Sequence, residues 1–165
     1  MPQTEFTDAI ALLKNDHRTV EDLFEKFESA RSGSKRALAE QICNELKIHA
    51  TIEEEIFYPA LRDKIEDDTL NEAYVEHDGA KLLINDIMAS NDDEMLEAKV
   101  KVLSEEIKHH VGEEEMRIEG MFAQAREAGV DLAALRDELM ARKESLMQTL
   151  KTEGLPPAEM QVLQA

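Results

Sequence analysis

The sequence predicts an all-α protein, an up-down-up-down antiparallel four-helix bundle with a C-terminal fifth helix. Charged residues make up 34% of the 165 residues, and the chain has only 6 Gly and 4 Pro, a composition that favours helices. Apolar residues also recur at alternating intervals of three and four along four successive segments, which is the period of a core-facing helical stripe. Short connections between such helices favour antiparallel neighbours.

The first predicted helix runs from about 7 to 30. Thr7 is a suitable N-cap, and Ser32-Gly33-Ser34 supplies the turn that follows. The inward positions are Ile10, Leu13, His17, Val20, Phe24 and Phe27. A histidine therefore stands where a leucine or isoleucine is expected.

The second predicted helix spans about 34 to 64, and the third about 68 to 89. In the second, the inward positions are Leu38, Ile42, Leu46, His49, Glu53, Ile56 and Ala60. Pro59 is expected to bend or loosen its last turns, because proline removes a backbone hydrogen bond. In the third, the inward positions are Leu70, Ala73, His77, Ala80, Ile84 and Ile87, and Asn91-Asp92-Asp93 makes the next turn.

The fourth predicted helix spans about 93 to 128, with Gly129 as its C-cap. Its inward positions are Leu103, Ile107, His110, Glu114, Ile118 and Met121. A fifth helix, about 131 to 151, carries a stripe of Leu132, Leu135, Leu139 and Leu146 that can dock on the bundle or on another subunit. We therefore divide the chain into a bundle, 1–128, and a helical extension packing on it, 129–165.

Composition restricts the function classes. Asp and Glu number 37 against 19 Lys and Arg, a formal charge of −18, which disfavours binding to nucleic acid or anionic lipid. Cys43 is the only cysteine, so neither an intrachain disulfide nor a thiolate metal cluster can form. Because no segment has the features of a signal peptide or approaches the ~20 apolar residues of a membrane span, we expect a cytoplasmic protein without membrane contact.

The inward histidines and glutamates predict a metal centre. Four helices each contribute one inward histidine, and His49 and His110 are each followed four residues later by a glutamate, Glu53 and Glu114, on the same helix face. Buried carboxylates need partners, and the predicted stripes offer no Lys or Arg. Imidazole and carboxylate donors suit iron, manganese or zinc, and two carboxylates able to bridge suit a pair of ions.

Neighbouring residues leave alternatives. His110 lies in register with Ile107 and Glu114, whereas His109 turns toward the flank, so His110 is the preferred ligand and His109 is expected at the surface or behind the ligands. Glu54 and Glu55 beside Glu53, and Glu113 and Glu115 beside Glu114, are the fallback ligands. Glu-x-x-His occurs once, at Glu106 to His109, so the ferritin-like scheme with two copies fits poorly.

Four segments together resemble the hemerythrin-like family, the HHE cation-binding domain, over roughly Ile10 to Arg126. They are Asp16-His17, His49-Ala-Thr-Ile-Glu53-Glu-Glu-Ile-Phe-Tyr-Pro59, Glu76-His77 and His109-His110-Val-Gly-Glu-Glu114-Glu. The resemblance implies a non-haem di-iron centre with an oxo or hydroxide bridge and an exchangeable position for dioxygen or a related ligand. It makes His17, His49, His77 and His110 terminal ligands, and Glu53 and Glu114 bridging ligands.

The chain departs from that pattern at Ala73, where dioxygen-carrying hemerythrins have a fifth histidine one turn before the position of His77. Water, Glu21 or Tyr74 are the alternatives for the vacant position. The segment after Glu115 also lacks the proline that ends the second helix.

Three functions follow from these observations. The first is binding of dioxygen or a related small redox ligand, for storage, delivery or sensing. The second is a di-iron enzyme that decomposes peroxide or handles nitric oxide, which an open coordination position favours. The third is a metal-responsive regulatory module that contacts a protein partner, or a second copy of the chain, through the fifth helix.

Overall fold

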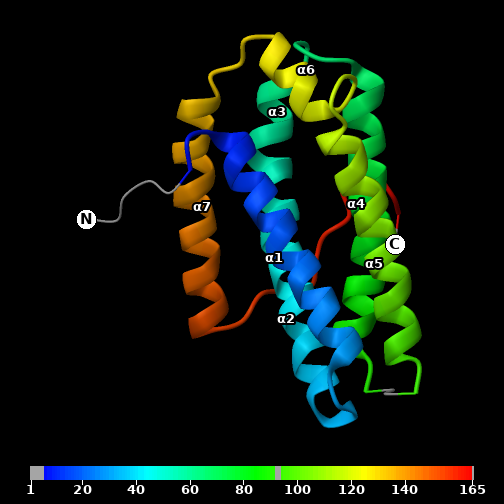
Figure 1. The fold of residues 1–165 in the computed structure, drawn as a ribbon. Helices are drawn as coiled ribbons and strands as arrows, with labels where there is room; N and C mark the ends of the chain where they lie inside the picture. Colours follow the sequence, from blue (N-terminus) through cyan, green and yellow to red (C-terminus); the bar gives the residue numbers. More distant parts are fainter. Residues whose placement is uncertain (1–5, 92–93, 165) are drawn as a thin grey trace.

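The computed structural model describes residues 6–91 and 94–164, and within these ranges every regular element is a helix. Figure 1 shows the long helices of the bundle side by side, with the C-terminal helix along one flank. In chain order the elements are α1 (Ala9–Ser29), α2 (Ser32–Ile52), the π-helix η1 (Glu53–Phe57), α3 (Tyr58–Leu61), α4 (Asp67–Ala89), α5 (Leu96–Glu115), α6 (Met121–Glu127) and α7 (Leu132–Thr152). The expected all-α bundle is confirmed. Asp92 and Asp93 of the expected turn lie outside the described residues.

The N-cap of the first helix lies one residue later than the sequence predicts. The side chain of Asp8 accepts a hydrogen bond from the Ala11 amide at 2.9 Å, so Asp8, and not Thr7, is the N-cap. The expected inward stripe is correct, since Ile10, Leu13, His17, Val20, Phe24 and Phe27 are all buried. His17 therefore enters the core from a regular helix.

The second predicted helix is interrupted by η1, which directly follows α2. The amide of Tyr58 donates to the carbonyl of Glu53, the wide turn of a π-helix. Proline at 59 cannot donate a backbone hydrogen bond, and its ring crowds the carbonyl four residues earlier, so a wider turn fits this segment. The turn shifts the inward face: Phe57, Tyr58 and Leu61 are fully buried, replacing Ile56 and Ala60.

The fourth predicted helix ends early, at Glu115, and α6 follows after a short break. A Cβ at Gly120 would lie 2.7 Å from the Met116 amide nitrogen and closer still to its carbonyl oxygen, so only glycine fits this turn. Ile118, expected in the core, is 81% exposed as a result. Gly129, predicted to be the C-cap of the fourth helix, follows α6 instead, where it lies directly after the C-cap Ala128 with a φ of 73°.

The fifth helix packs within the chain. Leu132, Leu135 and Leu139 are buried in one apolar cluster with residues of α1, η1 and α6, and α7 contacts both α1 and α2. Of the two expected uses of the leucine stripe, docking on the bundle is therefore the one observed. No helix of the described ranges is long and apolar enough to cross a membrane.

Two apolar clusters fill the interior, and a polar layer separates them. One cluster joins the N-terminal half of α1 to η1, α6 and α7, and the other joins the C-terminal half of α1 to α2, α4 and α5. The four inward histidines and the two core glutamates are absent from both clusters, although they are as buried as the apolar residues around them. The bundle thus holds a polar site at mid-length.

Candidate metal centre

The six residues that the sequence singles out converge in this polar layer. His17, His49, His77 and His110 come from α1, α2, α4 and α5 and are at most 8% exposed, while Glu53 and Glu114 are 0% and 1% exposed. They form two groups, His17, His49, Glu53 and Glu114, and Glu53, His77 and His110, whose donor atoms lie within 4.8 Å of one another. Each group can hold one cation, and Glu53 belongs to both.

Both glutamates face histidines on either side. Oε1 of Glu53 lies 3.0 Å from Nε2 of His49 and 3.2 Å from Nε2 of His77. Likewise, Oε1 of Glu114 lies 3.2 Å from Nε2 of His17 and 3.5 Å from Nε2 of His110. A carboxylate with a histidine of each group beside it is suited to bridge a pair of ions.

The Nδ1 atom of each histidine contacts a second carboxylate, always on another helix. The pairs are His17 with Glu115 at 2.5 Å, His49 with Asp16 at 2.9 Å, His77 with Glu54 at 2.7 Å and His110 with Glu76 at 2.7 Å. The partners form a closed ring around the bundle, which we call the carboxylate ring: Asp16, Glu54, Glu76 and Glu115. A carboxylate behind each imidazole fixes its orientation and places the Nδ1 proton there.

Nε2 of each of these four histidines then offers a lone pair toward the centre. Whether those lone pairs have other partners tests whether cations fit there. Nε2 of His17 and of His49, Oε2 of Glu53 and Oε1 of Glu114 are buried and have no hydrogen-bond partner among the described residues. Nε2 atoms of His77 and His110 face each other at 3.1 Å. Unpaired acceptors crowded in a dry interior are costly, and cations satisfy them. The residues present therefore fit a pair of metal ions.

Tyr58 enters the same centre and was not anticipated from the sequence. Its hydroxyl lies 2.9 Å from Glu114 Oε2, 3.1 Å from His77 Nε2, and 3.3 Å from both His110 Nε2 and Glu53 Oε1. One hydroxyl proton cannot satisfy four acceptors. The phenol oxygen thus stands among the donors of the second group, and it is a candidate for the coordination position that the resemblance leaves open at Ala73.

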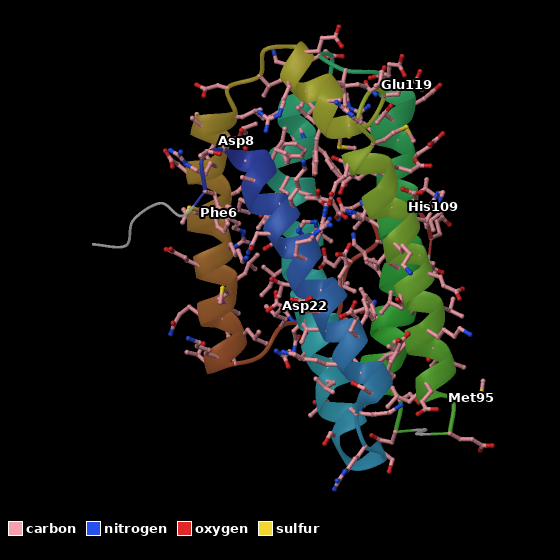
Figure 2. The ribbon with its side chains drawn as sticks, viewed as in Figure 1. Phe6, Asp8, Asp22, Met95, His109 and Glu119 are labelled. Carbon is pink, nitrogen blue, oxygen red and sulfur yellow. The ribbon has the colours of Figure 1, made fainter. Side chains whose placement is uncertain are left out.

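The other candidates for that position lie elsewhere. Tyr74 packs its ring against Tyr58, with centroids 5.3 Å apart, and no described contact brings its hydroxyl to the centre. Glu21 pairs with Arg18 and is 44% exposed. His109, 66% exposed, pairs with Glu76 and Glu113 and points outward from α5 in Figure 2, as its register predicts.

The fallback ligands prove to have other positions. Glu54 and Glu115 belong to the carboxylate ring, Glu55 pairs with Arg142 at 2.7 Å, and Glu113 contacts the exposed His109. The sequence did contain a signal for the ring. Its members stand one residue before His17 and His77 and five residues after His49 and His110, a spacing repeated in both halves of the bundle.

Without a cation, protons neutralise the centre. Burial lowers the pKa of His77, but hydrogen bonds to Glu53 and Glu54 outweigh it and raise this pKa to about 9. The pKa of His49 also lies well above its usual value, because the charge of Glu53 and the bond to Asp16 outweigh burial. Burial raises the pKa of Glu53, yet the neighbouring histidines hold it well below its ordinary value.

We therefore expect the metal-free protein to lose stability as pH rises. The raised pKa of His77 contributes fully to the free energy of unfolding below the unfolded-state pKa of 6.5. This contribution is lost as pH rises through the folded-state pKa of about 9. Each unit of difference between the two pKa values corresponds to about 1.4 kcal/mol. Urea unfolding in the presence of a chelator, between about pH 5.5 and about pH 10 so that the range extends roughly one unit beyond both pKa values, measures this. His77→Gln should flatten the profile, and His109→Gln should leave it unchanged; equal slopes in all three proteins would contradict the expectation.

The carboxylate ring gives a second prediction. Glu76→Gln removes the charged partner of His110 Nδ1, so the affinity of the centre for a metal ion should fall by about 10- to 100-fold. Competition with a coloured chelator measures the affinity. Glu113→Gln is the matched control, because Glu113 contacts the exposed His109 alone among the histidines of the described chain; equal affinities of the two variants would show that the ring does not support the ligands.

Comparison with known proteins identifies the family of this chain. The model of the hemerythrin HHE cation-binding domain family matches residues 8–122, a range that contains both groups, the carboxylate ring and Tyr58. Among solved structures, the chain is similar to an HHE cation-binding domain-containing protein from Mycobacterium kansasii, with a TM-score of 0.72 and 23% identity over 91% of this chain and 96% of that chain. Comparison with the curated proteins gives no match. Since the family model covers more than half of the sequence, the chain belongs to the hemerythrin HHE cation-binding domain family.

Proposed function

We propose that the chain is a non-haem di-iron protein, and that it decomposes peroxide at this centre. The position of Tyr58 among the donors of the second group is the observation that carries the choice of activity. His17, His49, His77 and His110 would be terminal ligands, and Glu53 and Glu114 would bridge. The donor set of imidazole and carboxylate, with no thiolate, supports iron.

A tyrosine oxygen changes the electronic character of the site. Burial and the charges of Glu114 and Glu53 raise the pKa of Tyr58 well above its usual value in the metal-free protein, so the phenol stays neutral until a cation draws off its proton. Phenolate is a hard, charged donor and favours ferric over ferrous iron. Reversible dioxygen carriage starts from the ferrous state, whereas peroxide can react with the ferric state, so Tyr58 favours turnover.

Access and stoichiometry are consistent with this proposal. A cavity of about 340 Å³ reaches all four histidines, which is ample for a peroxide molecule. Two molecules of hydrogen peroxide give two of water and one of dioxygen, one being reduced and the other oxidised, so no further reductant is required. The iron pair supplies the change of oxidation state, while Glu53 and Glu114 hold the site's negative charge in a dry interior.

An oxygen electrode and metal analysis test the proposal. Protein loaded anaerobically with ferrous ion should retain about two irons per chain and release dioxygen from added peroxide. Metal-free protein and the His49→Ala variant should release none. Protein that stays iron-free after loading would overturn the di-iron assignment; iron-loaded protein that leaves peroxide unchanged would overturn the activity alone.

Dioxygen binding for storage or sensing is the second candidate. The cavity beside the histidines is mostly apolar, with Val20, Leu46 and Ile84 in its wall, and an apolar, enclosed site protects a bound oxygen molecule from water and protons. A stable, reversible adduct in the optical spectrum, with no consumption of peroxide, would favour this function.

A further inference from the structure

The cavity that reaches the histidines is larger than a diatomic ligand or a peroxide needs. Its volume is about 340 Å³, against about 30 Å³ for one water molecule in the liquid, and it falls in the range of small-molecule sites. It extends from the centre between α2 and α4 toward α7 and the C-terminal segment. Apolar side chains of the wall are Val20, Leu46, Ala80, Ile84, Ile107 and Leu146.

The C-terminal segment, residues 153–164, covers the outer end of this cavity. It has no helix or strand, and Figure 1 shows it passing from α7 behind the bundle and along α4. Polar contacts with α4 hold it: the Gln161, Val162 and Leu163 amides donate to the Asp78 carboxylate at 2.7 to 3.0 Å. Asn85 also exchanges two hydrogen bonds of 2.9 Å with the backbone of Ala158. The covering segment is thus fixed in place.

The carboxylates of α1 and η1 in the cavity wall already have cationic partners. Asp16 pairs with Lys143 at 2.5 Å and Glu54 with Lys81 at 2.7 Å. Glu55 pairs with Arg142 at 2.7 Å. These cations are therefore not available to a ligand.

Lys47 differs from them. It lines the cavity and is only 7% exposed, yet no carboxylate of the described residues lies within ion-pair distance of it. Among the described residues, the Nζ of Lys47 donates only to the Leu155 carbonyl, in a long contact of 3.5 Å. A buried ammonium without an anion is costly, and in a chain with a formal charge of −18 it is unexpected. Lys47 therefore marks a place for an anionic group.

We propose that this cavity binds an aliphatic monocarboxylate of medium length, with its carboxylate on Lys47 and its chain along the apolar wall. A single cation matches a single negative charge, and the apolar lining matches an alkyl chain of several carbons. A phosphate or a dicarboxylate would meet Glu54, Glu55 and Asp16 with charge left unpaired. Binding needs no redox step, so it stands apart from the proposed activity.

Calorimetric titration of the iron-loaded full chain tests the site, with octanoate, octan-1-ol and acetate as probes. Octanoate should bind the native protein, and Lys47→Met should weaken it by about ten- to a hundredfold, the loss of one charge-assisted hydrogen bond. Octan-1-ol, which has the chain without the charge, should bind both proteins equally. Lys99→Met, which removes a surface lysine paired with Asp86, should leave octanoate binding unchanged.

Acetate separates this site from direct coordination of iron, because carboxylates are also iron ligands. If octanoate binds no better than acetate, or binds Lys47→Met as well as the native protein, the proposal is wrong. Failure to bind octanoate leaves the peroxide reaction unaffected, and failure of the peroxide reaction leaves the titration unaffected. The two proposals can thus be judged separately.

Discussion

Glu53→Gln should reduce the iron content from about two ions per chain to one or fewer. We expect this loss to be the largest effect of any single substitution, because a bridging ligand is shared by both ions. Glu53 is fully buried and is the one residue common to both groups of donor atoms. An amide keeps the shape of the side chain but loses the charge and one donor oxygen. Metal analysis after anaerobic loading, with the optical spectrum, measures the effect.

The same variant should be less stable when metal-free. His49 and His77 share Glu53 as an acidic partner at 3.0 and 3.2 Å, and removal of one partner from a buried ion pair costs about 3–5 kcal/mol. Glu55→Gln is the matched control, since Glu55 lies on the same turn but pairs with Arg142 at the surface. Retention of both irons by Glu53→Gln would refute the bridging role.

The bundle and its six central residues could be predicted because five of the six lie in regular α-helix, and the sixth, Glu53, directly follows the last residue of α2. In α1 and α4 the three-and-four spacing of apolar residues continues unbroken through His17 and His77, and every expected inward residue there is buried. A regular period carries the direction of a side chain reliably along several turns. The convergence of four such helices then follows from the antiparallel bundle.

The carboxylate ring could not be obtained from the period of one helix, because each of its bonds joins two helices. Asp16 stands beside His17 in the sequence, yet it accepts from His49, and Glu76 beside His77 accepts from His110. Which flank of a helix meets which neighbour depends on the packing of the bundle. The spacing alone predicts a charged flank and leaves its partner open.

Irregular backbone explains the remaining differences. Five residues of α-helix rotate a side chain by about 140°, which would turn Tyr58 away from Glu53, whereas the π-turn brings both to the centre. At the other end, the close approach of Gly120 to Met116 breaks the expected fourth helix and exposes Ile118. Both irregularities arise from local backbone geometry. A prediction from helical periodicity treats the backbone as a uniform α-helix, so it misses them.

Tyr58→Phe should keep iron bound but change its spectrum and its reactivity. The four histidines and two glutamates remain, so iron content should stay near that of the native protein. The phenolate-to-iron charge-transfer band should disappear. The rate of dioxygen release from peroxide should fall by at least about tenfold, because removing even a residue that only hydrogen-bonds to a metal ligand typically lowers activity by that factor. Resonance Raman spectroscopy and an oxygen electrode measure the two effects.

Tyr74→Phe separates coordination from packing. The ring of Tyr74 contacts the ring of Tyr58. Tyr74→Phe therefore removes a hydroxyl close to the centre and leaves every donor atom of the centre in place. Native spectrum and turnover in Tyr74→Phe, with both altered in Tyr58→Phe, would show that the Tyr58 oxygen binds iron. An unchanged spectrum in Tyr58→Phe would instead mean that the hydroxyl only donates to Glu114. The second ion would then keep an open position, and dioxygen binding would become the better-supported function.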